Sequence, residues 1–367
     1  LVEESYDTIR WMTSIGVRWQ LTELFRVAGD TVTRFSPGAV LTARDEGVGL
    51  MEDLFASAER CEIEILYDTK CVGLVTDDRG AVIGARVRDA NGTRVLPADA
   101  VVLAAGGFEA NTEMRVKYLG PAWDRARVRG TRFNTGEVLT AALEIGAKPF
   151  GNWSGCHATP IDADAPWVGA LAMTDKTNRL SYPYGITVNT EGRRFVDEGE
   201  DFASYTYAKI GAAILSQPQA RAYQVFDQKV LHLLERRYAT GKSVEADSLE
   251  DLALILGLPK STFVETVQTY NDSVQEGTFD PSTLDGKHTR GIYPPKSNWA
   301  LPLDSPPFVA YPVTCGITFT YGGVAIDTEA RVLDTEDRPI PGLYATGEIA
   351  GGFFYANYPG GAGLTRG

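Results

Sequence analysis

Two apolar segments that stop abruptly at small residues restrict the fold more than any other feature. The first spans residues 98–108 and ends at Gly106 and Gly107, and the second spans residues 342–348 and ends in Ala-Thr-Gly-Glu. A continuous apolar run is typical of a strand buried on both faces of a parallel sheet. At the carboxyl end of such a strand, small residues let the backbone approach a phosphate or sugar. The pair therefore predicts a nucleotide site, although either segment alone could be a tight strand-to-helix turn.

The rest of the chain predicts a mixture of strands and helices. Short β-rich runs at 63–66, 71–75 and 81–87 predict a strand followed by a small antiparallel meander. Helical spacing predicts a helix from Asp7 to near Gly16. Residues 249–256 and 263–270 predict amphipathic helices, each after a capping Ser or Thr, and the proline-rich segment 293–307 predicts irregular structure.

Length and composition predict two domains and limit the kinds of partner. A chain of 367 residues exceeds what one core usually organises, and its change in character predicts one domain from residues 1–150 and 319–367, with 151–318 inserted. The formal charge of -13 argues against nucleic acid or an anionic membrane surface as a partner. Because no segment approaches the roughly 20 apolar residues of a membrane span, and the first residues do not resemble a signal peptide, we expect a cytoplasmic protein that is not integral to a membrane.

The cysteines predict neither a metal site nor a disulfide framework. Cys61, Cys71, Cys156 and Cys315 lie far apart, without a C-x-x-C pair and with only three histidines in the chain. We expect buried, reduced thiols, with disulfides as the alternative.

The final segment, residues 351–367, combines many glycines with aromatic residues. After a buried strand, this composition suits a loop that contacts a flat ligand and then opens a helix, whose free N–H groups could face an electron-rich oxygen. The alternative is a flexible tail, although tails seldom carry so many aromatic residues.

Five motifs in order resemble the flavoprotein subunits of the fumarate reductase and succinate dehydrogenase family. They lie at residues 98–111, 134–147, 155–158, 188–198 and 321–363. The resemblance implies an α/β fold with an α+β insertion: a split, Rossmann-like FAD-binding domain and an inserted capping domain, with the substrate between the cap and the isoalloxazine ring. Because the Gly-x-Gly-x-x-Gly sequence that usually begins FAD binding is absent from the first 60 residues, we expect the N-terminal finger to be missing. The alternative is then a catalytically incompetent fragment that cannot hold FAD.

The resemblance also implies which residues meet the cofactor. Glu348 falls at the family's ribityl-binding glutamate, and Glu137 at an acid on the cofactor side. The other implied contacts are backbone or small-residue positions: Ala105 and Gly106 near the cofactor, Cys71 and Val72 at the adenine, and Gly363 and Leu364 at the pyrimidine end of the flavin.

The chain departs from the family's reductases at the substrate. Phe202 stands at the position of the proton-donating arginine, and Phe319 and Tyr358 replace a substrate-binding histidine and arginine. Only His157 matches a substrate ligand of the family. Segments 197–209, 294–299, 314–319 and 354–361 look most like the tricarballylate dehydrogenase branch, which oxidises tricarballylate to cis-aconitate and passes electrons to a separate partner protein. The Tyr-Pro-Gly element at 358–360 is also similar to that of 3-ketosteroid dehydrogenases, so a steroid or enone dehydrogenase is the alternative enzyme.

The predicted reaction removes a proton beside a carboxylate and passes a hydride from the neighbouring carbon to flavin N5. We expect catalytic roles for Tyr358, His157 and Arg132, and substrate binding by Arg129, Lys296, Thr318 and Phe319. The arginines could instead pair with surface carboxylates, and Lys296 could be a solvated loop charge. Tyr205 and Tyr207 are interpreted as packing residues of the cap.

Overall fold

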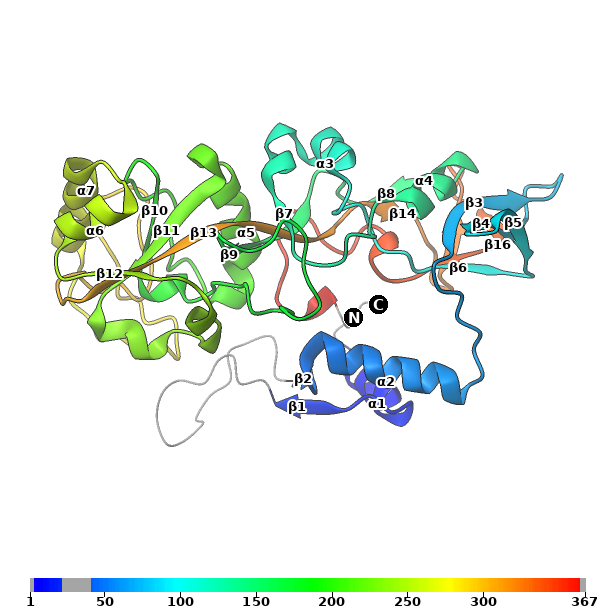
Figure 1. The fold of residues 1–367 in the computed structure, drawn as a ribbon, viewed down its shortest axis with the longest axis horizontal. Helices are drawn as coiled ribbons and strands as arrows, with labels where there is room; N and C mark the ends of the chain where they lie inside the picture. The colour runs from blue at the N-terminus through cyan, green and yellow to red at the C-terminus, as the bar shows by residue number, and fades with distance from the viewer. Residues whose placement is uncertain (1–2, 22–40, 364–367) are drawn as a thin grey trace.

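The computed structural model describes residues 3–21 and 41–363. Two groups of strands lie toward opposite ends of a long molecule, and the hairpin β1–β2 lies with α1 and α2 along one side (Figure 1). The helices are α1 (Ser5–Ser14), α2 (Glu46–Arg60), α3 (Thr112–Leu119), α4 (Glu137–Glu144), α5 (Ala203–Leu215), α6 (Leu249–Leu256) and α7 (Lys260–Ser273). The strands are β1 (Trp19–Leu21), β2 (Leu41–Ala43), β3 (Lys70–Thr76), β4 (Val82–Asp89), β5 (Gly92–Pro97), β6 (Val101–Leu103), β7 (Arg127–Val128), β8 (Pro149–Phe150), β9 (Cys156–Asp162), β10 (Ile186–Asn189), β11 (Arg221–Phe226), β12 (Val244–Ala246), β13 (Phe308–Thr320), β14 (Gly323–Val324), β15 (Arg331–Leu333) and β16 (Pro339–Ala345).

The two apolar segments lie side by side, as the sequence predicts. β6 pairs in parallel with β16, which places Leu103 opposite Ala345, and β15 completes a three-stranded sheet. The amide of Thr346 donates to the carbonyl of Leu103 at 3.0 Å, so the two strands end together. The prediction that the first segment is buried on both faces is wrong. Val102 is 61% exposed because only one face of this sheet is covered by the core in the described part of the chain.

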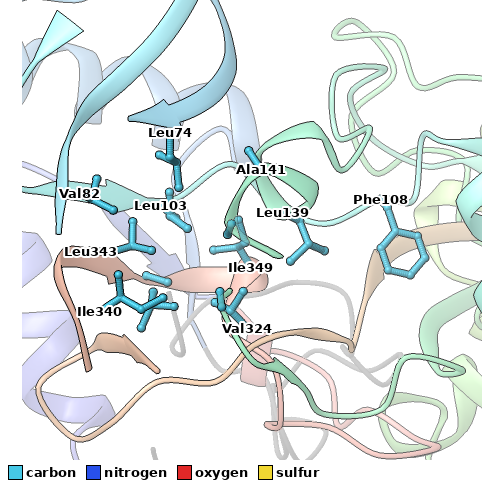
Figure 2. Close-up of a cluster of buried hydrophobic side chains, with 14 residues drawn as sticks. Leu74, Val82, Leu103, Phe108, Leu139, Ala141, Val324, Ile340, Leu343 and Ile349 are labelled. Atoms are coloured by element: carbon cyan, nitrogen blue, oxygen red, sulfur yellow. The ribbon is translucent and has the colours of Figure 1, made fainter. Parts of the chain in front are cut away.

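The covered face of this sheet packs in an apolar core (Figure 2). The antiparallel meander β3–β4–β5 contributes side chains to the same core. Leu74 and Val82 come from the meander, Leu139 from α4 and Leu343 from β16. The meander confirms the sequence prediction for residues 71–97. The additional strand expected at 63–66 is wrong: these residues form no strand, and Ile63 is 60% exposed because no neighbouring strand pairs with it.

The larger sheet is built around β13. β9, β11 and β12 pair with it antiparallel and β7 pairs parallel, while β10 extends the sheet beyond β11. Helix α5 packs closely on β9. A Cβ at Gly211 would come within 2.3 Å of the amide nitrogen of Thr159, so only glycine allows this approach. β7 shows that residues before 151 also contribute to this sheet, and β13 runs past residue 318. The domain boundaries at 150 and 318 therefore stay a prediction.

Among the α-helices of the described residues, only α3 and α6 have a side-chain N-cap. Ser248 caps α6, with its hydroxyl accepting from the amide of Asp251 at 3.1 Å, as predicted. The second predicted cap is wrong, because α7 begins at Lys260 after Pro259 and has no side-chain cap. The N-terminal helix is confirmed, and residues 293–307 contain neither helix nor strand, as expected.

All four cysteines are free thiols. Cys156 and Cys315 are buried as predicted, and burial raises the pKa of Cys315 to about 12. Cys61 is exposed and Cys71 half-buried, so the expectation of burial fails for these two, which lie at the end of α2 and at the start of β3. No helix in residues 3–21 or 41–363 is long and apolar enough to cross a membrane.

Candidate active site

His157 lies at the centre of a cluster of aromatic rings. It is the second residue of β9, opposite Phe319 of β13, and the two rings stack with centroids 5.2 Å apart. Tyr207 from α5 and Tyr358 from the final loop meet the imidazole edge-on, at 4.9 and 4.6 Å. The sequence suggested a turn with no apolar surface to bury this histidine. Instead it lies on a strand and is 3% exposed, because α5 and the final loop bring aromatic side chains over it.

The surroundings of His157 keep the imidazole neutral. Burial lowers its pKa well below the ordinary value, and the nearby positive charge of Arg129 lowers it further. Its Nδ1 atom is buried and has no hydrogen-bond partner among the described residues. A neutral imidazole with one unpaired nitrogen can exchange a proton or a hydrogen bond with a ligand.

Tyr358 presents a buried phenol beside this imidazole. Its oxygen accepts a hydrogen bond from the amide of Gly363 at 2.9 Å, and its ring packs edge-on against Phe319 and Phe354. Burial raises the pKa of Tyr358 above its ordinary value. The phenol therefore keeps its proton near neutral pH and can donate it in a hydrogen bond to a substrate.

Arg129 is the predicted substrate-binding cation that the structure brings to this cluster. Its amide donates to the carbonyl of Ile317 at 2.8 Å, and its Nη1 donates to the hydroxyl of Thr318 at 2.9 Å. These contacts follow from the parallel pairing of β7 with β13. The guanidinium also forms an ion pair with Asp175, and Arg237 pairs with the same carboxylate.

The two other predicted cations are not in the cluster. Arg132 is exposed, in the loop after β7. Lys296 is fully buried elsewhere, with Nζ donating to the carbonyl of Gly185 at 2.5 Å, and burial lowers its pKa to about 8. It is thus not the solvated loop charge that the sequence left as the alternative, and the predicted role as a carboxylate ligand gains no support from its position. Phe202, at the position of the reductases' arginine, packs against Trp299 with centroids 5.4 Å apart.

A pair of buried carboxyl groups lies where β6 and β16 end. Glu348 accepts from the backbone amide and the hydroxyl of Thr320 at 2.7 and 3.1 Å, and Glu109 accepts from the side-chain amide (Nδ2) of Asn134 at 2.5 Å. The other carboxyl oxygen of Glu109 has no hydrogen-bond partner among the described residues. Burial raises the pKa of both groups, and the negative charge of Glu348 raises that of Glu109 further. The pair therefore holds a proton more tightly than isolated carboxyls do.

Gly107 leaves room for the contact between Glu348 and Thr320. A Cβ at this position would lie 2.1 Å from the hydroxyl oxygen of Thr320 and 2.2 Å from Glu348 Oε1. Gly106 takes a positive φ of 73°, and the side chain of Ala105 is exposed. The small residues at this strand end therefore leave the backbone open to a close approach, which is why the sequence analysis expected them beside a nucleotide. The roles of Ala105 and Gly106 at a cofactor stay a prediction.

The remaining predicted cofactor residues within the described part of the chain lie in α4, β3 and the final loop. Glu137 begins α4 in an ion pair with Lys70; burial alone would raise its pKa, but the contacts with Lys70 and Thr135 lower it. Cys71 and Val72 lie at an irregularity of β3, where the pairing with β4 skips Val72. Gly363 lies beside Tyr358, and Leu364 is outside the described residues.

Sequence reasoning did not single out four residues of this region as site residues: Glu109, Asp175, Tyr207 and Phe354. Glu109 comes soon after the predicted strand end, so its position in the sequence could have identified it as a residue near the cofactor. Tyr207 was interpreted as packing, whereas its ring contacts both His157 and Tyr358. Asp175 lies in a loop without any motif. In residues 3–21 and 41–363, no group of His, Cys, Asp and Glu side chains could hold a metal ion.

The buried carboxyl pair makes a prediction for stability. Because the pKa of Glu109 is higher in the folded state than in the unfolded chain, the folded state binds more protons, and stability falls as the pH rises above the ordinary carboxyl range. Replacing Glu109 with Gln removes this group. We expect the melting temperature of the ligand-free protein at pH 8 to rise by about 2–4 °C, and its decline between pH 5 and 8 to become shallower. An unchanged pH profile, measured by differential scanning fluorimetry, would contradict the assigned shift.

The comparisons with known proteins agree on one family of flavoproteins. The model of the FAD binding domain matches residues 1–364. A fumarate reductase (cytochrome) of Shewanella frigidimarina is 31% identical over all of this chain, and a 4-oxocyclohexanecarboxylate 2-dehydrogenase of Sinomonas cyclohexanicum is 30% identical over 88% of it. The chain spans 60% of the length of the first protein and 58% of the second. The structure of a 3-ketosteroid delta1-dehydrogenase from Sterolibacterium denitrificans, solved with 1,4-androstadiene-3,17-dione, matches 88% of this chain and 61% of its own at 27% identity and a TM-score of 0.68.

Proposed function

Because the chain belongs to the FAD-binding family of the fumarate reductase and succinate dehydrogenase flavoproteins, we propose that it acts as an FAD-dependent dehydrogenase of a CH–CH bond beside a carbonyl group. The observation that carries this proposal is the aromatic cluster of His157, Tyr207, Phe319 and Tyr358. Such walls favour a substrate with an apolar body. Among known relatives, one is named for a cyclic ketone acid, and one was solved with a ketosteroid.

The residues at the strand ends fit the cofactor of this family. Gly107 leaves no room for a side chain beside Glu348, and Glu109 has a buried carboxyl oxygen in need of a donor, which the hydroxyl groups of a ribityl chain could supply. Glu348, Glu109 and the backbone of residues 105–107 would hold the flavin on this side. Once bound, FAD would supply the acceptor for a hydride.

The side chains of the cluster would prepare the substrate. The phenol of Tyr358 would donate a hydrogen bond to the substrate carbonyl, which makes the neighbouring C–H bond more acidic. His157, neutral and with Nδ1 unpaired, would take up the proton that leaves. Because its lowered pKa makes it a weak base, this transfer would depend on the hydrogen bond from Tyr358 to acidify the C–H bond. Phe319 and Tyr207 would exclude water from the reacting carbons.

Tricarballylate, the substrate predicted from sequence, is the second candidate. The observation in its favour is Arg129, which lies near His157 and is bonded to Thr318. Against it, Arg132 and Lys296 do not join the cluster, and Arg129 already pairs with Asp175. Three carboxylates would have to be desolvated with little compensating charge, which is costly. The steroid or enone alternative therefore fits the geometry better.

The two candidates can be separated by titrating the flavin-loaded protein under anaerobic conditions. We expect a neutral 3-ketosteroid to bleach the flavin absorbance, and succinate and tricarballylate to leave it unchanged. Bleaching by tricarballylate alone would overturn the ketone proposal. We further propose, as the sequence predicts, that the electrons pass to a separate acceptor protein and that the reaction takes place in the cytoplasm.

A further inference from the structure

Arg129 is fixed by partners on two sides, although it lies at the edge of the proposed substrate site. Nη1 donates to the hydroxyl of Thr318 at 2.9 Å, and Nη2 pairs with Asp175. Thr318 directly precedes Phe319, whose ring stacks on His157, so this guanidinium approaches the aromatic cluster along β13. Its Nε atom is buried and has no hydrogen-bond partner in residues 3–21 or 41–363. Arg129 therefore retains one unpaired donor but not an uncompensated charge.

Asp175 is held firmly in this pairing. Its carboxylate also pairs with Arg237 and accepts from the side-chain amide (Nδ2) of Asn178 at 2.6 Å. Arg237 in turn lies 3.0 Å from a carboxyl oxygen of Glu235. Four charged side chains thus alternate in sign, with the arginines mostly buried. A carboxylate that pairs with two arginines and accepts from a side-chain amide resists displacement. Moving it away would leave the buried charges of the two arginines without a partner.

We propose that Asp175 determines the substrate class of this site by occupying Arg129, so that the site accepts a neutral carbonyl compound and rejects polycarboxylates. The inference rests on the proposed function only in placing the substrate at the His157 cluster. A substrate carboxylate could bind Arg129 only by displacing Asp175 or by adding a negative charge beside it. Removing the charge of Asp175 would make Arg129 available to a substrate carboxylate.

The test is the variant Asp175→Asn, which keeps the size of the side chain and a hydrogen-bond acceptor. Ligand binding is followed by perturbation of the flavin spectrum, which needs no turnover. We expect the affinity for tricarballylate to rise at least tenfold, and the affinity for a neutral 3-ketosteroid to change by less than about threefold. A folded variant whose tricarballylate affinity equals that of the wild type would overturn the inference.

Asp162→Asn is the matched control. Asp162 lies on β9 and pairs with Arg179 at 2.6 Å, so this variant also removes an aspartate from an arginine of the larger sheet region. We expect it to leave tricarballylate affinity unchanged; an equal gain in both variants would show that any loss of negative charge suffices, and would overturn the assignment to Asp175. In the double variant Asp175→Asn/Arg129→Gln the gain should disappear, and a retained gain would overturn the role of Arg129.

If Asp175→Asn does not fold, the wild type can be compared with the single variant Arg129→Gln. Because Arg129 is already occupied, Arg129→Gln should not weaken the binding of tricarballylate further, and a clear loss would show that Arg129 already binds carboxylates. The proposed function can fail separately. If no ketone bleaches the flavin while Asp175→Asn still gains affinity for tricarballylate, the inference on Asp175 is supported and the ketone reaction is not.

Discussion

Replacing Tyr358 with Phe should lower turnover of a ketone substrate by about 10²–10⁴-fold while flavin remains bound. The phenol is buried, keeps its proton because its pKa is raised, and lies edge-on to His157 with centroids 4.6 Å apart. The ring of Phe keeps the packing against Phe319 and Phe354. The change removes the phenol oxygen, which is the hydrogen-bond donor to the substrate and the acceptor of the Gly363 amide. Steady-state kcat, measured with an artificial electron acceptor, and the flavin content of the purified variant give the result.

Tyr205→Phe is the matched control for this variant. Tyr205 lies on α5, two residues before Tyr207, and its carbonyl rather than its phenol accepts from Asn357 at 2.8 Å. We expect its kcat to stay within about twofold of the wild type. If Tyr358→Phe turns over as fast as Tyr205→Phe with the same flavin content, Tyr358 has no part in the chemistry.

Gly107→Ala should weaken FAD binding by at least about 100-fold. The new methyl group would lie 2.1 Å from the hydroxyl of Thr320 and 2.2 Å from Glu348, so Glu348 must leave its hydrogen bonds with Thr320. A displaced Glu348 would also lose its proposed hydrogen bonds to the ribityl chain of the flavin, and charge-assisted bonds of about 1.5–3 kcal/mol each account for a change of this order. Quenching of FAD fluorescence on titration with the ligand-free protein measures the affinity.

Gly47→Ala tests whether the loss is specific. Gly47 lies in α2, and a Cβ there meets nothing within 4 Å, so alanine fits without displacement. We expect unchanged FAD affinity and equal or slightly greater stability, since alanine favours a helix over glycine by about 1 kcal/mol. Equal FAD affinity for Gly107→Ala and Gly47→Ala, with both variants folded, would exclude the strand end as a flavin contact.

The sequence was most informative where one local pattern permits a single arrangement. Small residues at the ends of two apolar runs predicted adjacent strands, and the pairing of Leu103 with Ala345 confirms this. The turn sequences between residues 77 and 92 likewise predicted the meander. These features depend on short stretches of chain, in which turn chemistry and hydrophobic pattern act together.

The candidate site could be predicted less well, because it is assembled from distant segments. His157 was selected by its resemblance to a family ligand, but the rings that bury it come from α5, β13 and the final loop. Asp175 has meaning only through its contacts with Arg129 and Arg237, 46 and 62 residues away in sequence. For Lys296, the local sequence predicted the wrong environment. A lysine beside prolines suggests an exposed loop, whereas tertiary packing buries it completely.

We propose that the flavin lies at the joined ends of β6 and β16, with its reactive ring facing His157 and Tyr358. A crystal structure of the FAD-loaded protein would show whether it does. We predict a ribityl chain within hydrogen-bond distance of Glu348 and a flavin ring bordering the phenol of Tyr358. Electron density that places the flavin away from residues 105–107 and Glu348, or that separates its ring from Tyr358 by other parts of the protein, would contradict the account.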